Sequence, residues 1–298
     1  MDSGVRRNDE SEAMNGQVDI PMPPTKTKDP AIPFEDSPDY VQSLARGLSV
    51  VRAFDREHAR LTLSEVAART GLTRAVARRS LLTLRHLGYV AQDARDFYLR
   101  PRVLELGYSY LASLGLGEIA QQPMEELSHR VSESCSMAVL DAADVIYVAR
   151  VPVRRVMSIA LGVGARLPAF VTSMGRVMLA ALSDAELDDW LAANKLRAIT
   201  PHTLSKATAW REEIARVRRD GYAIVAQELE LGLCSIAIPI RASNGHVVAG
   251  LNVGMAWRDG VREHALKKIL PALARTRESI ERALARSGWT PAAEARRR

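Results

Sequence analysis

The 298-residue sequence has few cysteines and no pattern of metal ligands. Its two cysteines, Cys135 and Cys234, lie far apart in apolar surroundings, without the CxxC or Cys/His spacing of a zinc site or a disulfide framework. The histidines likewise show no HxxxH spacing. We therefore expect no bound metal and a reducing compartment.

Long apolar segments are also missing. No run approaches the roughly 20 residues that cross a bilayer, and the polar N-terminal sequence lacks the layout of a signal peptide. These absences predict a soluble, cytoplasmic chain with no membrane partner. With 47% hydrophobic residues, the length allows a tail, a small domain and a domain of roughly 150 residues.

Catalytic motifs are absent as well. The stretch Thr172-Ser173-Met174-Gly175 is no GxSxG elbow, and the pattern supplies no histidine as a base. Gly162-Val163-Gly164 lacks the third glycine and the βαβ context of a dinucleotide site. The pair Glu228 and Glu230 is more typical of a solvated or salt-bridged pair than of an acid/base dyad. We expect no catalytic residue, no cofactor and no enzyme activity.

Composition divides the chain into five parts. Residues 1–39 are polar and rich in proline, which predicts a disordered tail. Residues 40–101 predict a winged helix-turn-helix domain and residues 102–117 a linker helix. Residues 118–286 form the larger domain, for which the family resemblance described below implies an effector-binding role, and residues 287–298 form a basic C-terminal tail.

The small domain contains three predicted helices and a hairpin. Ser43 is a candidate cap for the first helix. Thr62 and Glu65 form a capping box for the second, which ends at Thr70-Gly71. Thr73 caps a third helix that runs to about His86, with Gly88 at its end. The hairpin predicted at residues 88–92 and 97–100 would be the wing.

The third helix carries the predicted DNA-binding surface. No acidic residue occurs between Leu72 and Gln92, and the whole chain has a formal charge of +6. Ala77, Ser80 or Leu81, and Leu84 recur at the spacing of an inward face, which would turn Arg74, Arg78 and Arg85 outward. The candidate base contacts are Thr73, Arg74, Val76 and Arg78.

Other basic residues are better suited to phosphates, because they lie beside this face or on the wing. Arg79 lies at the side of the helix, Arg46 at the start of the first helix, and Arg95 and Arg100 flank the wing; Arg85 completes the candidate surface. The alternative is that these arginines form an ordinary solvated face.

The remaining sequence alternates between helical and extended patterns. Helices are predicted near residues 120–134, 174–182, 184–194, 207–220 and 261–285, and strands near residues 136–140, 145–151, 156–162, 222–228, 235–241 and 247–255. This order favours an α+β fold in which helices flank a mostly antiparallel sheet.

The chain resembles the IclR-type transcriptional regulators over residues 42–285. The resemblance is carried by SLARGLSVVRAF, LTLSEVAARTGLTRAVARRSLLTLRHLGYV, LPAFVTSMGRVMLAAL and ELELGLCSIAIPI. Within that family it is most similar to the regulators of protocatechuate, para-hydroxybenzoate and β-ketoadipate catabolism. The resemblance implies a GAF-like effector domain, a homodimer or dimer of dimers, and a small carboxylate effector, an aromatic acid or a β-ketoadipate-like acid.

The resemblance also implies an effector pocket. A carboxylate could bind at the start of a helix, at Ser173, Met174 and Gly175. Arg150, Arg154 and Arg155 are candidate guanidinium ligands of a carboxylate, or interface residues. The further pocket residues are Met157, Glu228, Ser235, Asn252 and Gly254. At a position where relatives often have an aspartate, this chain has Val225 or Ala226. We therefore expect its pocket to prefer a different acid.

These observations predict a ligand-responsive regulator that binds a double-stranded DNA operator, with RNA polymerase as a candidate partner. Two alternatives remain. One is a ligand-binding module that acts through protein contacts, and the other is a small-molecule enzyme built on the larger domain.

Overall fold

The computed structural model describes residues 34–55, 57–107, 115–153 and 161–289. The chain forms two compact units, which divide between Arg102 and Val103. Each unit has its own hydrophobic core. None of the helices in the described ranges is long and apolar enough to cross a lipid bilayer.

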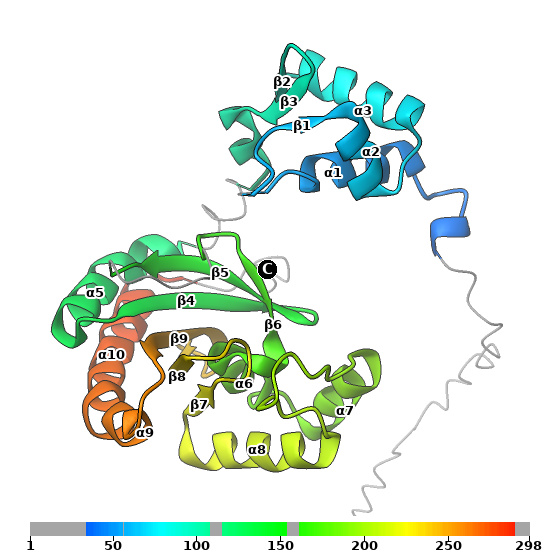
Figure 1. Ribbon diagram of the computed structural model, residues 1–298. Coiled ribbons are helices and arrows are strands. Elements are labelled where there is room, and N and C mark those ends of the chain that lie inside the picture. Colours follow the sequence, from blue (N-terminus) through cyan, green and yellow to red (C-terminus); the bar gives the residue numbers. More distant parts are fainter. Residues whose placement is uncertain (1–33, 56, 108–114, 154–160, 290–298) are drawn as a thin grey trace, which may run out of the picture. The chain divides into compact units, whose positions relative to one another are not determined.

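The first unit is a three-helix domain with a small sheet (Figure 1). Its strands pair antiparallel in the order β1-β3-β2. Val50, Val66, Leu81 and Phe97 lie in its core. Its elements are η1 (Phe34–Asp36), α1 (Gln42–Arg52), β1 (Leu61–Thr62), α2 (Leu63–Thr70), α3 (Arg74–His86), β2 (Val90–Asp93) and β3 (Asp96–Leu99).

Local capping sets the ends of α2 and α3. Both bonds of the predicted capping box are present: Glu65 N–H donates to Thr62 Oγ1 over 3.4 Å, and Thr62 N–H donates to Glu65 Oε2 over 2.7 Å. Gly71 ends α2 with φ of +69°, a conformation that glycine adopts without steric cost. Thr73 then accepts a bond from Val76 N–H and starts α3.

The structure of this unit differs from the expectation at three places. Helix α1 begins at Gln42 with Val41 at its N-cap, so Ser43 lies inside the first turn and does not cap it. Strand β1 was not predicted, because two residues are too few for a periodic signal. The predicted tail overlaps η1, where the ring of Phe34 packs edge to face on Tyr40.

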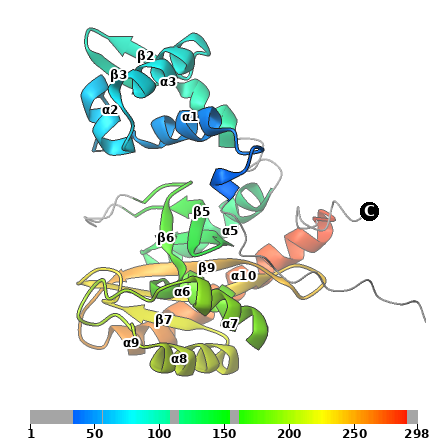
Figure 2. The ribbon, with the colours of Figure 1, turned by 90° about the vertical axis from the view of Figure 1, so that its right-hand side faces the viewer.

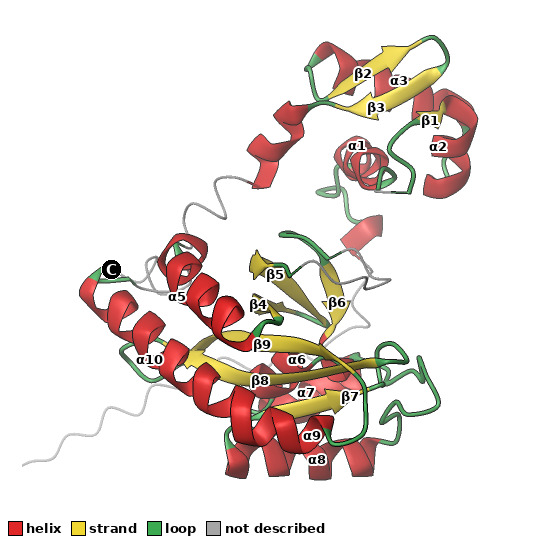
Figure 3. Ribbon diagram, turned by 60° about the vertical axis from the view of Figure 1, so that its left-hand side comes forward, coloured by secondary structure: helices red, strands yellow, loops and turns green. Residues whose placement is uncertain are grey.

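The second unit consists of one antiparallel sheet between two helical layers (Figures 1 and 3). The strand order is β6-β5-β4-β9-β8-β7. The strands are β4 (Ser134–Asp141), β5 (Asp144–Val151), β6 (Arg166–Pro168), β7 (Ala223–Ala226), β8 (Leu233–Arg241) and β9 (Val247–Ala256). The α+β fold with an antiparallel sheet is confirmed.

Helices cover both faces of this sheet. Helices α5 and α10 pack against one face through the buried side chains of Leu116, Met124, Leu273 and Ile280. On the other face, α6 packs on the strands and on α8, and α7 lies beside them (Figure 2). The helices are α5 (Leu116–Val131), α6 (Ser173–Leu179), α7 (Asp184–Ala193), α8 (Ala207–Asp220), α9 (Val261–His264) and α10 (Leu270–Arg286), with a π-helical turn at Ala265–Ile269 between the last two.

Some expected elements differ. In the predicted linker helix, Pro101–Leu104 form a 3₁₀ turn (η2) and residues 105–107 are helical, while residues 108–114 lie outside the described residues. Leu116 and Gly117, expected in the linker, lie in the first turn of α5. Most of the expected strand at residues 156–162 lies outside the described residues, and its last two residues are not part of a strand. At the C-terminus, Trp289 packs on the core of the second unit although the basic tail was expected to begin at residue 287.

A β-bulge disturbs the pairing of β4 with β5. Met137 pairs with Ala149, but the next residue, Ala138, pairs with Tyr147, so Val148 is an extra residue on β5. An extra residue reverses the alternation of side chains between the two faces of a sheet. The side chains of Tyr147 and Arg150, which are three positions apart, therefore lie on the same face of the sheet.

Candidate functional site

Helix α3 presents the basic surface of the first unit. Ala77 and Leu81 are fully buried and Leu84 is partly buried, so the predicted inward face is present. Thr73 and the arginines at 74, 78, 79 and 85 are exposed, while Val76 is half-buried. The surface offers hydrogen-bond donors and positive charge, which DNA phosphates and guanine edges accept.

The arginines of α3 are of two kinds. Arg74 donates to Ser64 Oγ of α2, and Arg85 donates to Gln92 Oε1 of the wing over 2.6 Å. Arg78 and Arg79 have no side-chain hydrogen bond or ion pair within the described residues. The first two arginines therefore brace the domain, and the second two are available to a partner.

The outlying basic residues lie where expected. Arg95 is exposed in the β2–β3 turn, beside Ala94 with φ of +50°, and Arg100 is exposed just after β3. Arg46 is half-buried on α1. Arg60 also reaches the wing, where it binds Asp93 over 3.0 Å and packs on the ring of Tyr98.

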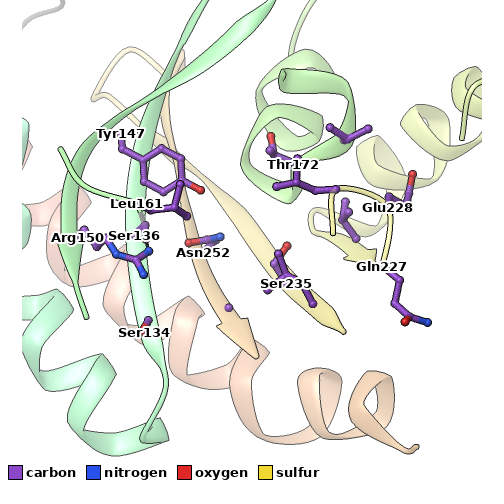
Figure 4. Close-up of a pocket in the computed structure, with 15 residues that line it drawn as sticks. Ser134, Ser136, Tyr147, Arg150, Leu161, Thr172, Gln227, Glu228, Ser235 and Asn252 are labelled. Atoms are coloured by element: carbon purple, nitrogen blue, oxygen red, sulfur yellow. Dashed lines mark hydrogen bonds between the residues drawn. The ribbon is translucent and has the colours of Figure 1, made fainter. Parts of the chain in front are cut away.

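The second unit contains a pocket on the α6 face of its sheet (Figure 4). It holds about 530 Å³ of empty space, a volume that includes its open mouth. The lining residues are Ser134, Ser136, Tyr147, Arg150, Leu161, Val171, Thr172, Val225, Gln227, Glu228, Leu229, Leu233, Ser235, Asn252 and Gly254.

Two adjacent rows of residues across the sheet form the floor of the pocket. In one row Arg150 of β5 pairs with Ser136 of β4, which pairs with Asn252 of β9. In the next row Ser134 pairs with Gly254, and Gly254 with Ser235 of β8. A Cβ added at Gly254 would meet no atom within 4 Å. The floor is therefore polar, and it is open above Gly254.

Arg150 is the cation of this floor. Its Nη1 donates to Ser136 Oγ over 3.1 Å, and within the described residues it has no carboxylate partner. Figure 4 shows Arg150, Ser136 and Tyr147 on the opposite side of the pocket from Glu228, with Asn252 and Ser235 between them. Burial raises the pKa of Tyr147 to about 12, although the charge of Arg150 opposes the shift, so its hydroxyl stays protonated at neutral pH.

Glu228 lines the pocket, but its charge is already neutralised. Arg176, which is 1% exposed, donates to both oxygens of this carboxylate over 2.8 and 2.6 Å. The same guanidinium donates through Nε to the carbonyl of Phe170, and Leu204 N–H also donates to Glu228. Neither charge is free to bind an effector.

The predicted helix start lies behind the wall of the pocket. Ser173 donates to Ser235 Oγ over 2.9 Å and is buried. Met174 packs against Gly250, where an added Cβ would come within 2.9 Å of it. At Gly175 an added Cβ would lie 2.1 Å from the carbonyl oxygen of Ala169. These three residues support the wall, and Thr172 is the lining residue at this helix.

Arg150, Glu228, Ser235, Asn252 and Gly254 are thus the predicted residues that the structure brings to one pocket. Arg154, Arg155 and Met157 lie outside the described residues. Val225, named from the sequence only as a position where relatives have aspartate, also lines the pocket. Sequence reasoning missed the other lining residues: Ser134, Ser136, Tyr147, Leu161, Val171, Thr172, Gln227, Leu229 and Leu233. The alternation of Ser134 and Ser136 along a buried strand was the available signal.

A helix-turn-helix domain joined to a unit with a polar pocket defines the class of ligand-sensing DNA-binding proteins. Comparison with known proteins specifies the family. The IclR helix-turn-helix domain matches residues 43–94, and the C-terminal domain of bacterial transcriptional regulator IclR matches residues 108–282. The chain belongs to the IclR family of transcriptional regulators, so the prediction of a DNA-binding regulator is confirmed and the enzyme alternative is excluded.

Two curated relatives are transcriptional regulators by name. The chain is 42% identical over 241 residues to the Pca regulon regulatory protein of Pseudomonas putida, a match that covers 80% of this chain and 83% of the relative. It is 35% identical over 247 residues to the p-hydroxybenzoate hydroxylase transcriptional activator of Acinetobacter baylyi, with coverage of 81% and 91%.

A solved structure shows a relative with a ligand. The IclR homolog of Microbacterium hydrocarbonoxydans complexed with 4-hydroxybenzoate superposes with a TM-score of 0.71 at 26% identity. The match covers 81% of this chain and 98% of that one.

Proposed function

We propose that this protein controls genes of aromatic-acid catabolism in response to a small carboxylate bound in the pocket. The observation that carries the proposal is Arg150, a half-buried guanidinium on the pocket floor without a carboxylate partner in the described residues. A partly desolvated cation favours an anion, and guanidinium can bind a carboxylate through two hydrogen bonds. The names of the relatives support an aromatic acid.

We further propose that α3 enters the major groove. Thr73, Arg74, Val76 and Arg78 are the candidate base contacts, and Arg46, Arg79, Arg85, Arg95 and Arg100 the candidate phosphate contacts. Arg78 is exposed and has no side-chain partner among the residues that the structure describes, whereas Arg74 and Arg85 already donate within the domain. Arg78 is therefore the best-placed candidate to contact guanine.

The proposed active species is a homodimer or a dimer of dimers on a pseudo-palindromic operator, with recognition helices about 34 Å apart. Bound effector would change the spacing or orientation of the two DNA-binding units, and RNA polymerase is the candidate partner for the response. Because its target is chromosomal DNA, we place the protein in the cytoplasm.

The test is a fluorescence-anisotropy titration of the full-length protein on its own upstream intergenic DNA. We expect binding that weakens steeply with salt, because phosphate contacts release counterions, and that shifts when an aromatic acid is added. Arg150→Met is the matched variant: it should bind the DNA like the parent protein and lose the response to the acid. A full response in Arg150→Met would contradict the proposed site.

A further inference from the structure

Asn252 has an unusual position on the pocket floor. Its side chain is 9% exposed and lines the pocket from the middle of β9. Its Oδ1 is buried without a hydrogen-bond partner; within the described residues, only one oxygen of Glu230 shares this property. Buried acceptors without a partner are rare and costly, so a partner is expected to arrive from outside the chain.

The polar neighbours of Asn252 have other hydrogen-bond partners and do not contact its side-chain oxygen. Across the sheet it pairs with Ser136, whose oxygen accepts a bond from Arg150, and with Ala237, which has no polar side-chain atom. Ser235, in the adjacent row, accepts a bond from Ser173. None of them donates to the Asn252 oxygen. A donor group on the bound molecule would therefore find this acceptor unpaired.

The charge of the pocket limits that molecule further. Arg150 is the one cation among the described lining residues, and Glu228 is neutralised by Arg176. A single cation matches a single carboxylate. The remaining wall is largely apolar, with Leu161, Val171 and Leu229 on it, which suits an uncharged hydrocarbon body.

We infer that the effector is a hydroxylated aromatic monocarboxylate whose carboxylate binds Arg150 and whose ring hydroxyl donates to Asn252 Oδ1. This inference rests on the proposed function and selects among the acids that it allows. An aliphatic dicarboxylate offers two acceptor groups and no donor, so it would leave the Asn252 oxygen unpaired. It would also bring a second negative charge without a second cation in the described lining.

Isothermal titration calorimetry of the full-length protein tests the inference with 4-hydroxybenzoate, 3-hydroxybenzoate, benzoate, 4-fluorobenzoate, 3-fluorobenzoate and adipate. Fluorine is close to a hydroxyl in size but cannot donate. We expect one hydroxybenzoate to bind about tenfold more tightly than benzoate and its fluoro counterpart, the size of effect expected for one buried hydrogen bond. Equal binding of the hydroxyl and fluoro acids, or tighter binding of adipate, would overturn the inference.

Two variants locate the effect. Asn252→Leu should bind the hydroxyl and fluoro acids equally, because the acceptor is gone. Asn194→Leu, which changes an asparagine outside the pocket whose Nδ2 donates to Trp190, should keep the full preference. A preference that survives in Asn252→Leu would assign the hydroxyl to another residue. If Asn252→Leu fails to fold by circular dichroism, Asn252→Ser and the wild-type ligand series decide.

The outcomes separate the two levels of the argument. If several acids bind and change DNA affinity without a benefit from the hydroxyl group, only the assignment of Asn252 fails. If no acid in the series binds, the proposed aromatic-acid effector fails with it.

Discussion

Replacing Arg176 by methionine should destabilise the second unit more than any surface charge deletion. Arg176 is 1% exposed and makes three hydrogen bonds, two to the Glu228 carboxylate and one to the Phe170 carbonyl. Without it, Glu228 would be a buried carboxylate whose remaining partner is the N–H of Leu204. Removing one member of a buried ion pair costs about 3–5 kcal/mol, a large part of the roughly 5–15 kcal/mol that stabilises a domain.

Urea denaturation followed by tryptophan fluorescence measures this loss. All four tryptophans, at positions 190, 210, 257 and 289, lie in the second unit, so the signal reports that unit alone. Arg211→Met is the matched control, because its ion pair with Asp188 is about half exposed and such pairs contribute about 0–1 kcal/mol. If Arg176→Met costs no more than Arg211→Met, the reasoning about the buried pair is refuted.

Combining Glu228→Leu with Arg176→Met extends the test. With both charges removed, no buried carboxylate is left without its cation, so the double variant should lose less stability than the sum of the two single variants. Strict additivity would show that the two side chains act independently.

Three further predictions concern DNA binding, the pocket and pH. Arg78→Ala should weaken specific operator binding more than nonspecific binding, by about 1–3 kcal/mol if Arg78 contacts a base. Arg85→Ala should weaken specific and nonspecific binding about equally, because Arg85 supports the wing through Gln92. Competition anisotropy with operator and random DNA distinguishes these two outcomes. Gly254→Leu places its side chain in open space over the pocket floor, so it should abolish effector binding in calorimetry without weakening DNA binding; retained effector affinity would move the site elsewhere. Burial raises the pKa of Tyr147 from 10.0 to about 12, so this group contributes stability that is complete below pH 10 and is lost as the pH rises toward 12. Tyr147→Phe should therefore reduce the fall in the free energy of unfolding at alkaline pH. An unchanged fall would assign the alkaline loss of stability to other groups.

The DNA-binding unit could be predicted closely from the sequence because its signals are local. A capping box at Thr62 and Glu65, a left-handed glycine at position 71 and a threonine cap at position 73 each act within a few residues. The contacts of individual arginines could not be predicted in this way. Arg74 and Arg85 reach residues of other elements, and helical periodicity alone does not show such long-range bonds.

The residues of the pocket could not be predicted from local signals in the sequence. Its floor joins side chains from β4, β5, β8 and β9, and only the register of the sheet shows that they share one face. Family resemblance supplied Ser235, Asn252 and Gly254, but it also suggested Ser173 and Met174, which the structure places behind the wall. The pairing of Arg176 with Glu228, 52 positions away in sequence, has no periodic signature.

The extra residue on β5 affects how this chain should be aligned with its relatives. A homologue that lacks a counterpart of Val148 would keep similar residues along the strand but turn the side chain at the position of Arg150 to the opposite face. An ungapped alignment would then equate a guanidinium inside the pocket with one packed beneath it. Effector preferences should therefore be transferred between such regulators only after the gap on this strand has been placed.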